Sequence, residues 1–270
     1  LAITSFMRFI TIRKIPRWSP AMPKGIASPN PRYTANENRS SRKDGKIKEK
    51  VVYLPSCMNR VMGPSVKDKN KRPLWKIMVT LLERGGYEVV FPENFEKLCC
   101  GMSWDSKGFR TEAIQKAKEL ETALLKVSEN GRHKVLCDQS PCLSHMRETI
   151  KSIPYLYEPV EFIDRFLRNK LSTKKINEPI AIHITCSTHK MELDEAFFRV
   201  ANACSEKVLI PEDITCCGFA GDKGFTHPEL NHFSLRKLRS QIREYDIKNG
   251  YSNSRTCEIG LSDNSSIPYQ

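Results

Sequence analysis

FPENFEKLCCGMSWDSKGF (residues 91–109) and IPEDITCCGFAGDKGF (residues 210–225) are two versions of one motif. Each begins with an apolar residue followed by proline and glutamate, continues to Cys-Cys-Gly, and ends with lysine, glycine and phenylalanine. The copies lie about 120 residues apart, a spacing far longer than the unit of a solenoid repeat. The sequence therefore predicts two related domains that face each other.

Matching residues continue on both sides of this motif. VVYLPSC (51–57) upstream matches IAIHITC (180–186), and DQSPC (138–142) downstream matches SRTCE (254–258). Each half therefore holds a cysteine that closes a strand, a vicinal pair before a glycine, and a fourth cysteine about forty residues later. These eight of the ten cysteines are Cys57, Cys99, Cys100 and Cys142 in the first half, and Cys186, Cys216, Cys217 and Cys257 in the second.

Short β-branched segments alternate with helical patterns from residue 51 onward, as in βαβ units. We expect an α/β fold of two duplicated lobes, each a small, mainly parallel sheet flanked by helices. The cysteines are expected near the carboxyl ends of the strands. The predicted strands are residues 51–56, 87–92, 133–137, 180–185 and 207–211, and the predicted helices are residues 74–84, 109–128, 160–169, 193–204 and 228–245.

The lead segment differs in composition from the rest of the chain. Residues 1–50 hold 12 Lys and Arg against 3 Asp and Glu, whereas residues 51–270 hold 32 against 28. We predict a basic, proline-containing linker at 1–50, a first cysteine-rich domain at 51–172 and a second at 173–270. Because no basic block follows residue 72, the charge distribution argues against a nucleic-acid partner.

The opening FMRFITIRKI is amphipathic and basic. It has two interpretations, a helix that packs on a neighbouring domain and a helix that lies on a membrane surface. The uncharged stretch at the start is too short for a secretion signal or a membrane span, and the first residue is Leu1. We expect a piece of a longer, cytoplasmic polypeptide, with peripheral contact at the inner face of the membrane as the open alternative.

Three kinds of site compete for the repeated cysteines. A structural zinc site usually contains close C-x-x-C pairs, and neither half has one. Adjacent cysteines reach a cluster of several irons more easily than one small ion, which favours an iron–sulfur cluster, although the ferredoxin run C-x2-C-x2-C-x3-C-P is absent. A dithiol redox site, tuned by cations such as Lys107 or Lys223, is the third option.

The residues that follow each vicinal pair have expected roles of their own. Gly101 and Gly218 are expected to let the backbone turn tightly against a bulky cofactor and to direct an N–H toward the sulfurs of that cofactor. Asp105 and Asp222 are expected to cap the next helix, with hydrogen bonding to the metal ligands as the alternative. The chain contains no dinucleotide fingerprint, phosphate loop or nucleophile elbow, so we expect no flavin, NAD or ATP site within it.

The remaining cysteines and the histidines give weaker signals. Cys137 ends a predicted strand and is either an additional metal ligand of the first site or a buried strand end. Cys204 lies in an apolar helix and is predicted to belong to the core. His183 alternates with isoleucines and is predicted to be a buried side chain rather than a ligand. His189 and His227 lie near the second cysteine set and are candidates for tuning it.

The double pattern C…CCG…C resembles the cysteine-rich CCG domain pair found in heterodisulfide reductases, in the iron–sulfur component of glycolate oxidase and in FAD-linked D-lactate dehydrogenases. HITCSTHKM (183–191), HPELN (227–231) and YSNSRTCEIGLS (251–262) are most similar to the last of these, the large cytochrome-type enzymes. WSPAMPKG (18–25) resembles the linker of the same enzymes. The likeness covers roughly residues 51–270, without the C-x-x-C ending of the heterodisulfide reductases.

The resemblance implies an iron–sulfur electron-transfer portion of a D-lactate (D-2-hydroxy acid) dehydrogenase. The eight repeated cysteines would bind an iron–sulfur cluster of the 4Fe-4S type, with Cys137 as a further metal ligand. FAD would lie in a flavin domain outside this chain, beside a ferredoxin-like module, and a quinone or cytochrome would accept the electrons. The chain would be a fragment or subunit that is inactive alone. A thiol–disulfide reductase of the heterodisulfide type and a zinc-binding scaffold stay open as alternatives.

Overall fold

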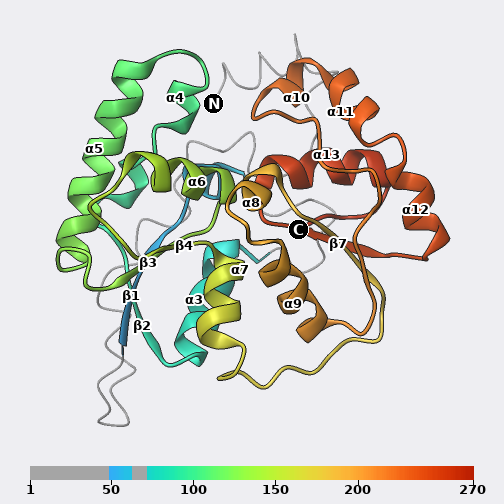
Figure 1. The fold of residues 1–270 in the computed structure, drawn as a ribbon, viewed down its shortest axis with the longest axis horizontal. Helices are drawn as coiled ribbons and strands as arrows, with labels where there is room; N and C mark the ends of the chain where they lie inside the picture. The colour runs from blue at the N-terminus through green and yellow to red at the C-terminus, as the bar shows by residue number, and fades with distance from the viewer. Residues whose placement is uncertain (1–48, 63–71) are drawn as a thin grey trace.

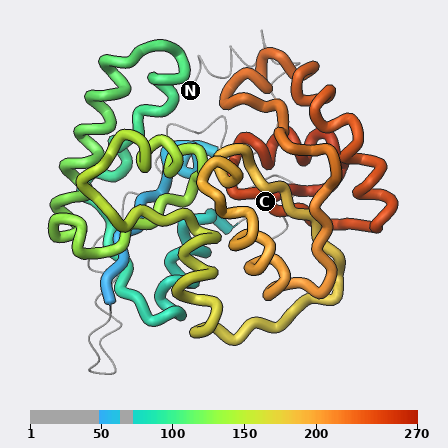
Figure 2. The backbone as a smooth tube through the Cα atoms, in the orientation of Figure 1, coloured from blue at the N-terminus to red at the C-terminus, as the bar shows by residue number. Residues whose placement is uncertain are grey.

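A computed structural model describes residues 49–62 and 72–270 of the chain, which form two α/β lobes (Figure 1). The predicted linker up to residue 48 and the amphipathic opening lie outside the described residues. Within the described part of the chain, no helix is long and apolar enough to cross a membrane. Figure 2 shows the first lobe in blue to green and the second in orange to red, joined by a yellow segment along one edge.

The first lobe is built on a parallel sheet with the strand order β2-β1-β3-β4. Its elements are β1 (Glu49–Leu54), α2 (Cys57–Val61), α3 (Leu74–Arg84), β2 (Tyr87–Val90), the 3₁₀ helix η3 (Phe95–Lys97), α4 (Met102–Asp105), α5 (Arg110–Val127), β3 (Lys134–Cys137), α6 (Ser140–Thr149) and β4 (Leu156–Tyr157). α7 (Pro159–Phe162) and the π-helix η4 (Ile163–Leu167) follow. This arrangement places the carboxyl ends of β1 and β3 side by side.

Alternate residues of β1 pack on opposite faces of this sheet. Val52 and Leu54 join an apolar cluster with residues of α5 and α6, whereas Val51 and Tyr53 join a second cluster with residues of α3 and η4. All four side chains are at most 5% exposed. Burial on both faces explains the continuous apolar run of this strand, which is typical of a parallel sheet covered by helices on both sides.

The second lobe repeats the arrangement with three parallel strands in the order β6-β5-β7. Its elements are β5 (Ile180–His183), α8 (Cys186–Lys190), α9 (Asp194–Cys204), β6 (Val208–Leu209), α10 (Lys223–Thr226), α11 (Pro228–Ser234), α12 (Leu238–Glu244), β7 (Asn249–Ser252) and α13 (Arg255–Ser265). In both lobes the first strand lies at the centre, between the second and the third. The predicted α/β fold with two duplicated, parallel-sheet lobes is confirmed.

Several details differ from the sequence-based expectations. Strands β4 and β7 and helices α2, α4, α6, α8, α10 and α13 were not predicted, and the helix expected over residues 228–245 is divided into α11 and α12. The helix expected over 160–169 is a short α-helix that continues as a π-helix. The assignment of Cys204 to the core is wrong, because its side chain is exposed at the end of α9. The domain division after residue 172 falls between η4 and β5 and stays a prediction.

Polar contacts join the two lobes close to the cysteines. The Ser140 backbone N–H donates to the Asn253 carbonyl oxygen at 3.1 Å, and Ser140 Oγ lies 2.8 Å from Ser187 Oγ. Ser140 is two residues before Cys142, and Ser187 directly follows Cys186. The buried contact between Ser140 and Ser187 therefore lies close in sequence to a cysteine of each set, Cys142 in the first lobe and Cys186 in the second.

Candidate functional site

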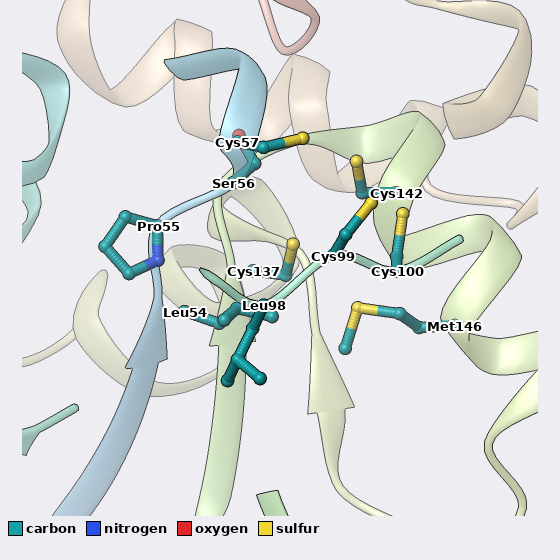
Figure 3. Close-up of a pocket in the computed structure, with 10 residues that line it drawn as sticks. All are labelled: Leu54, Pro55, Ser56, Cys57, Leu98, Cys99, Cys100, Cys137, Cys142 and Met146. Atoms are coloured by element: carbon teal, nitrogen blue, oxygen red, sulfur yellow. The ribbon is translucent and has the colours of Figure 1, made fainter. Parts of the chain in front are cut away.

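Four cysteines of the first lobe line one pocket beyond the ends of the strands (Figure 3). Cys57 begins α2 just after β1, Cys142 lies in the first turn of α6 after β3, and Cys99 and Cys100 precede α4. Their sulfur atoms lie in a row close to one another, and the sulfur of Cys137 lies closer to the strand ends. Cys137 is 1% exposed and lines the same pocket, so the structure brings all five predicted residues together.

The second lobe places its cysteines on the equivalent elements. Cys186 begins α8 after β5, and Cys257 lies in the first turn of α13 after β7. Cys216 and Cys217 form the vicinal pair before α10. The Cys217 and Cys257 Sγ atoms are 3.0 Å apart. Both lobes therefore bring cysteines from three separate segments to one point, as the duplicated sequence predicts.

The two sets have the same pattern of exposure. The second member of each vicinal pair and the last cysteine are buried: Cys100 and Cys142 in the first lobe, Cys217 and Cys257 in the second. Of the other two cysteines, those of the first lobe are partly exposed and those of the second lobe are exposed. A group bound by either set would have two buried cysteine ligands and two that solvent or a partner can reach.

Contacts between the sulfurs make the first thiol of each vicinal pair more acidic, and in the second lobe a hydrogen bond from Cys217 also lowers the pKa of Cys257, to about 5. Hydrogen bonds from the Cys100 and Cys57 thiols lower the pKa of Cys99. Cys216 occupies the same place in the second lobe, and hydrogen bonds from Cys186 and from the adjacent Cys217 thiol lower its pKa. Because the thiolate is the form that binds metals and acts as a nucleophile, the first cysteine of each vicinal pair is prepared for either chemistry.

The glycines after the vicinal pairs have a positive φ, 90° at Gly101 and 69° at Gly218. Their N–H groups donate to the first sulfur of each pair, at 3.4 Å to Cys99 Sγ and 3.3 Å to Cys216 Sγ. The expected contact of these N–H groups with the sulfurs of a cofactor stays a prediction. On the side where a Cβ would stand, Gly101 faces a helix and not an open space for a cofactor. A Cβ at position 101 would lie 2.5 Å from the Ala113 carbonyl oxygen of α5.

The expected helix-capping role of the aspartates is wrong. Asp105 is the last residue of α4, and Phe109 precedes α5 in the capping position. Asp222 stands just before α10, but its side chain makes no capping hydrogen bond. It instead forms an ion pair with Lys107 Nζ at 2.8 Å, which joins the repeated motif of one lobe to that of the other.

The histidines of the second lobe differ in their surroundings. His183 is buried as predicted, yet its ring lies with Cys217 and Cys257 in a group whose ligand atoms are all within 4.8 Å of one another. The sequence favoured a core role and missed this proximity. His189 pairs with Asp194, and His227 Nδ1 lies 2.8 Å from the Thr226 hydroxyl. A tuning role for His189 and His227 stays a prediction.

Two charged residues hold the cysteine-bearing segments in place. Asp138 is buried and accepts hydrogen bonds from the Tyr53 hydroxyl at 2.7 Å and from the Ser56 backbone N–H at 2.8 Å. It thereby fixes the residue that precedes Cys57. Arg255 Nε donates to Asn59 Oδ1 across the lobes at 2.9 Å. No role was predicted for Asp138 from the sequence. The available signal was its position directly after the strand that ends at Cys137, in the segment DQSPC (138–142) that matches SRTCE (254–258) in the other half.

Comparisons with known proteins point to the cysteine-rich segments. A family model described as a cysteine-rich domain, CCG, matches the chain twice, over residues 51–147 and 180–262. Each match contains one complete set of four cysteines. No curated protein matches the chain. One similar solved structure is a protein assigned as an Asp/Glu racemase from Yersinia pestis, with 11% identity, a TM-score of 0.32, and coverage of 82% of this chain and 92% of that chain.

Proposed function

The chain belongs to the family of CCG cysteine-rich domains, and from that premise we propose that its two cysteine sets bind iron–sulfur clusters that carry electrons. The observation that supports this proposal is the same row of neighbouring thiols in both lobes. In the first lobe the row runs from Cys57 through Cys99 and Cys100 to Cys142. Two such rows at equivalent places in the fold are unexpected for cysteines that merely fill a core.

The donor atoms fit such a cluster. Thiolates are the usual ligands of iron–sulfur clusters, and a row that includes two adjacent cysteines suits a group with several metal atoms better than a single tetrahedral ion. When bound, the cluster supplies a centre that accepts and donates single electrons. The protein contributes burial of two sulfurs per set, the Gly101 and Gly218 N–H donors, and the amino ends of α6 and α13, whose partial positive charge favours thiolates.

We further propose that this electron transfer serves a D-lactate (D-2-hydroxy acid) dehydrogenase. The support is the likeness of residues 183–191, 227–231 and 251–262 to the large FAD-linked enzymes. Electrons would come from a flavin domain through a ferredoxin-like module and leave toward a quinone or cytochrome. The accessible sulfurs of each set offer a point of entry and exit, and the Ser140–Ser187 contact keeps Cys142 and Cys186 on adjoining segments. A cytoplasmic site at the inner membrane face fits a quinone acceptor.

The cluster proposal is tested by electron paramagnetic resonance on chain purified without oxygen. We expect an iron–sulfur signal that loses one component in Cys100→Ala and the other in Cys217→Ala, because each variant removes a buried ligand from one lobe. Cys204→Ala is the matched control, since this exposed cysteine belongs to neither set, and its spectrum should equal that of the wild type. A chain that binds zinc and no sulfide would contradict the proposal and favour the zinc scaffold.

The dehydrogenase role needs a separate experiment. The cluster-loaded chain is mixed with a flavoprotein that oxidises a D-2-hydroxy acid, and D-lactate is added. We expect the visible absorbance of the cluster to bleach and to return when a quinone or cytochrome is supplied. Bleaching by dithionite but not by the flavoprotein with D-lactate would contradict this role while leaving the cluster proposal intact.

One observation favours a thiol–disulfide reductase as the second candidate. Cys216 is exposed, and hydrogen bonds from its neighbours lower its pKa, so its thiolate is available for attack on a disulfide. In that reaction Cys216 and Cys217 would become a disulfide while the substrate disulfide becomes two thiols. Disulfide turnover by metal-free chain, abolished in Cys216→Ser, would support this candidate over the cluster.

A further inference from the structure

The buried ring of His183 is hydrogen-bonded to Cys257, yet one of its two nitrogens, Nε2, lacks a partner among the described residues. The side chain is 2% exposed. A buried polar atom without a partner is unfavourable, and metal coordination is one way to satisfy an imidazole nitrogen. The ring lies beside two buried thiols, since the ligand atoms of His183, Cys217 and Cys257 are all within 4.8 Å of one another.

The pairing of the strands shows that this position faces the cysteines in both lobes. Leu54 of β1 pairs with Cys137 of β3, and both side chains line the cysteine pocket of the first lobe (Figure 3). At the equivalent position of the second sheet, His183 of β5 pairs with Ser252 of β7. Each lobe therefore places one additional donor at the same level of its sheet, a sulfur on the third strand in one lobe and a nitrogen on the first strand in the other.

We propose that His183 is a ligand of the metal centre in the second lobe, together with Cys217 and Cys257, whereas the centre of the first lobe is bound by sulfur alone. This inference rests on the proposed function, in which both sets bind a metal centre. According to this inference, the centres of the two lobes have different ligands and are not equivalent. The two lobes differ at the matching strand position, which is Leu54 in the first lobe and His183 in the second.

The difference in ligands gives the two centres different reduction potentials. A neutral imidazole donates less negative charge than a thiolate, and histidine ligation raises the potential of an iron–sulfur cluster. The second centre is therefore the better electron acceptor. An electron that leaves the first centre oxidises it and reduces the second, so the transfer between lobes runs from the all-sulfur site to the mixed site.

The test uses pulsed electron paramagnetic resonance, which detects a nitrogen bound to a paramagnetic cluster. It is carried out in the Cys100→Ala chain, so that the second lobe supplies the signal. We expect a strong nitrogen coupling that disappears in His183→Leu, which installs the first-lobe residue, and in His183→Cys, which restores a sulfur donor. His183→Cys should keep the iron content of its parent. His232→Ala is the control, because this exposed side chain pairs with Asn264 and should leave the coupling unchanged.

Retention of the nitrogen coupling in both His183 variants would overturn the inference, and so would its absence in a parent chain that carries the second-lobe cluster. Either result leaves the proposed function standing. If the chain binds no iron and sulfide, the proposed function fails first, and Co²⁺ titration of the metal-free Cys100→Ala chain then tests His183 directly. We expect at least tenfold weaker Co²⁺ binding in His183→Leu with a shifted ligand-field spectrum, and unchanged binding and spectrum would overturn the inference.

Discussion

Gly101→Ala tests whether the turn after the vicinal cysteines depends on close contact with a helix. Gly101 has a φ of 90°, a conformation that costs a residue with a Cβ about 1–2 kcal/mol. The new Cβ would also lie 2.5 Å from the Ala113 carbonyl oxygen and 3.2 Å from the Ala113 carbonyl carbon. Both atoms belong to the backbone of α5, so no side chain can rotate away, and overpacking of this kind costs about 1–3 kcal/mol.

Gly108→Ala is the matched control within the same segment. Gly108 has a φ of 85°, and nothing lies within 4 Å of the position that its Cβ would take. Its substitution therefore carries the backbone cost alone, about 1–2 kcal/mol. We expect Gly101→Ala to lower the free energy of unfolding by about 2–5 kcal/mol in total, and by about 1–3 kcal/mol more than Gly108→Ala.

Urea unfolding followed by circular dichroism measures both variants against the wild type. The free energies are compared at equal m-value, since a change in m would report a different unfolded or native state. Equal destabilisation by Gly101→Ala and Gly108→Ala would refute the reasoning, because it would show that α5 does not constrain the cysteine-bearing turn.

Three further substitutions have defined outcomes. Burial raises the pKa of Glu158 to about 7, so the free energy of unfolding falls by about 3 kcal/mol as pH rises from about 4.5 to about 7. Glu158→Gln should remove this part of the fall, which urea titrations at several pH values measure. An unchanged dependence of the unfolding free energy on pH would contradict the prediction. Arg255→Met leaves Glu258 buried without its cation and should lower the free energy of unfolding by about 3–5 kcal/mol in the same assay. The double variant Arg255→Met/Glu258→Gln should restore part of this loss. No recovery of stability in the double variant would count against the pairing. Lys107→Ala removes an exposed ion pair with Asp222 and should cost less than about 1 kcal/mol, with the difference lost at high salt; a larger, salt-independent loss would show that the pair has a structural role.

The duplicated sequence predicted the architecture well because both sheets are parallel and buried on both faces. Their central strands consist mainly of apolar residues, which the sequence displays directly. β7 escaped prediction because its sequence, NGYS, begins with the Asn-Gly pair typical of a turn. Its glycine is required by packing, since a Cβ at Gly250 would lie 2.5 Å from the ring of Tyr269.

The helices that carry the last cysteine of each set were not predicted for a different reason. α13 is polar in sequence, yet most of its residues are buried, including Arg255 and Glu258, which pair with each other. A helix without an exposed face shows no amphipathic period, so its sequence is easily taken for a loop. The spacing of the cysteines nevertheless predicted that Cys142 and Cys257 join their sets.

His183 shows where alternation along a strand loses its meaning. In a strand buried on both faces, every side chain is inside, so the pattern does not separate a core residue from a ligand. The comparison of the two halves carried the missing signal, because the residue that matches His183 is Leu54, an apolar side chain in the first cysteine pocket. Repeats are therefore informative at the positions where they differ as well as where they agree.

Iron, acid-labile sulfide and zinc, measured together on chain purified without oxygen, test the central claim most directly. The twin cysteine sets predict iron and sulfide in comparable amounts, with about half of both lost in Cys100→Ala and about half in Cys217→Ala. Zinc at one or two ions per chain, with no sulfide, would contradict the account.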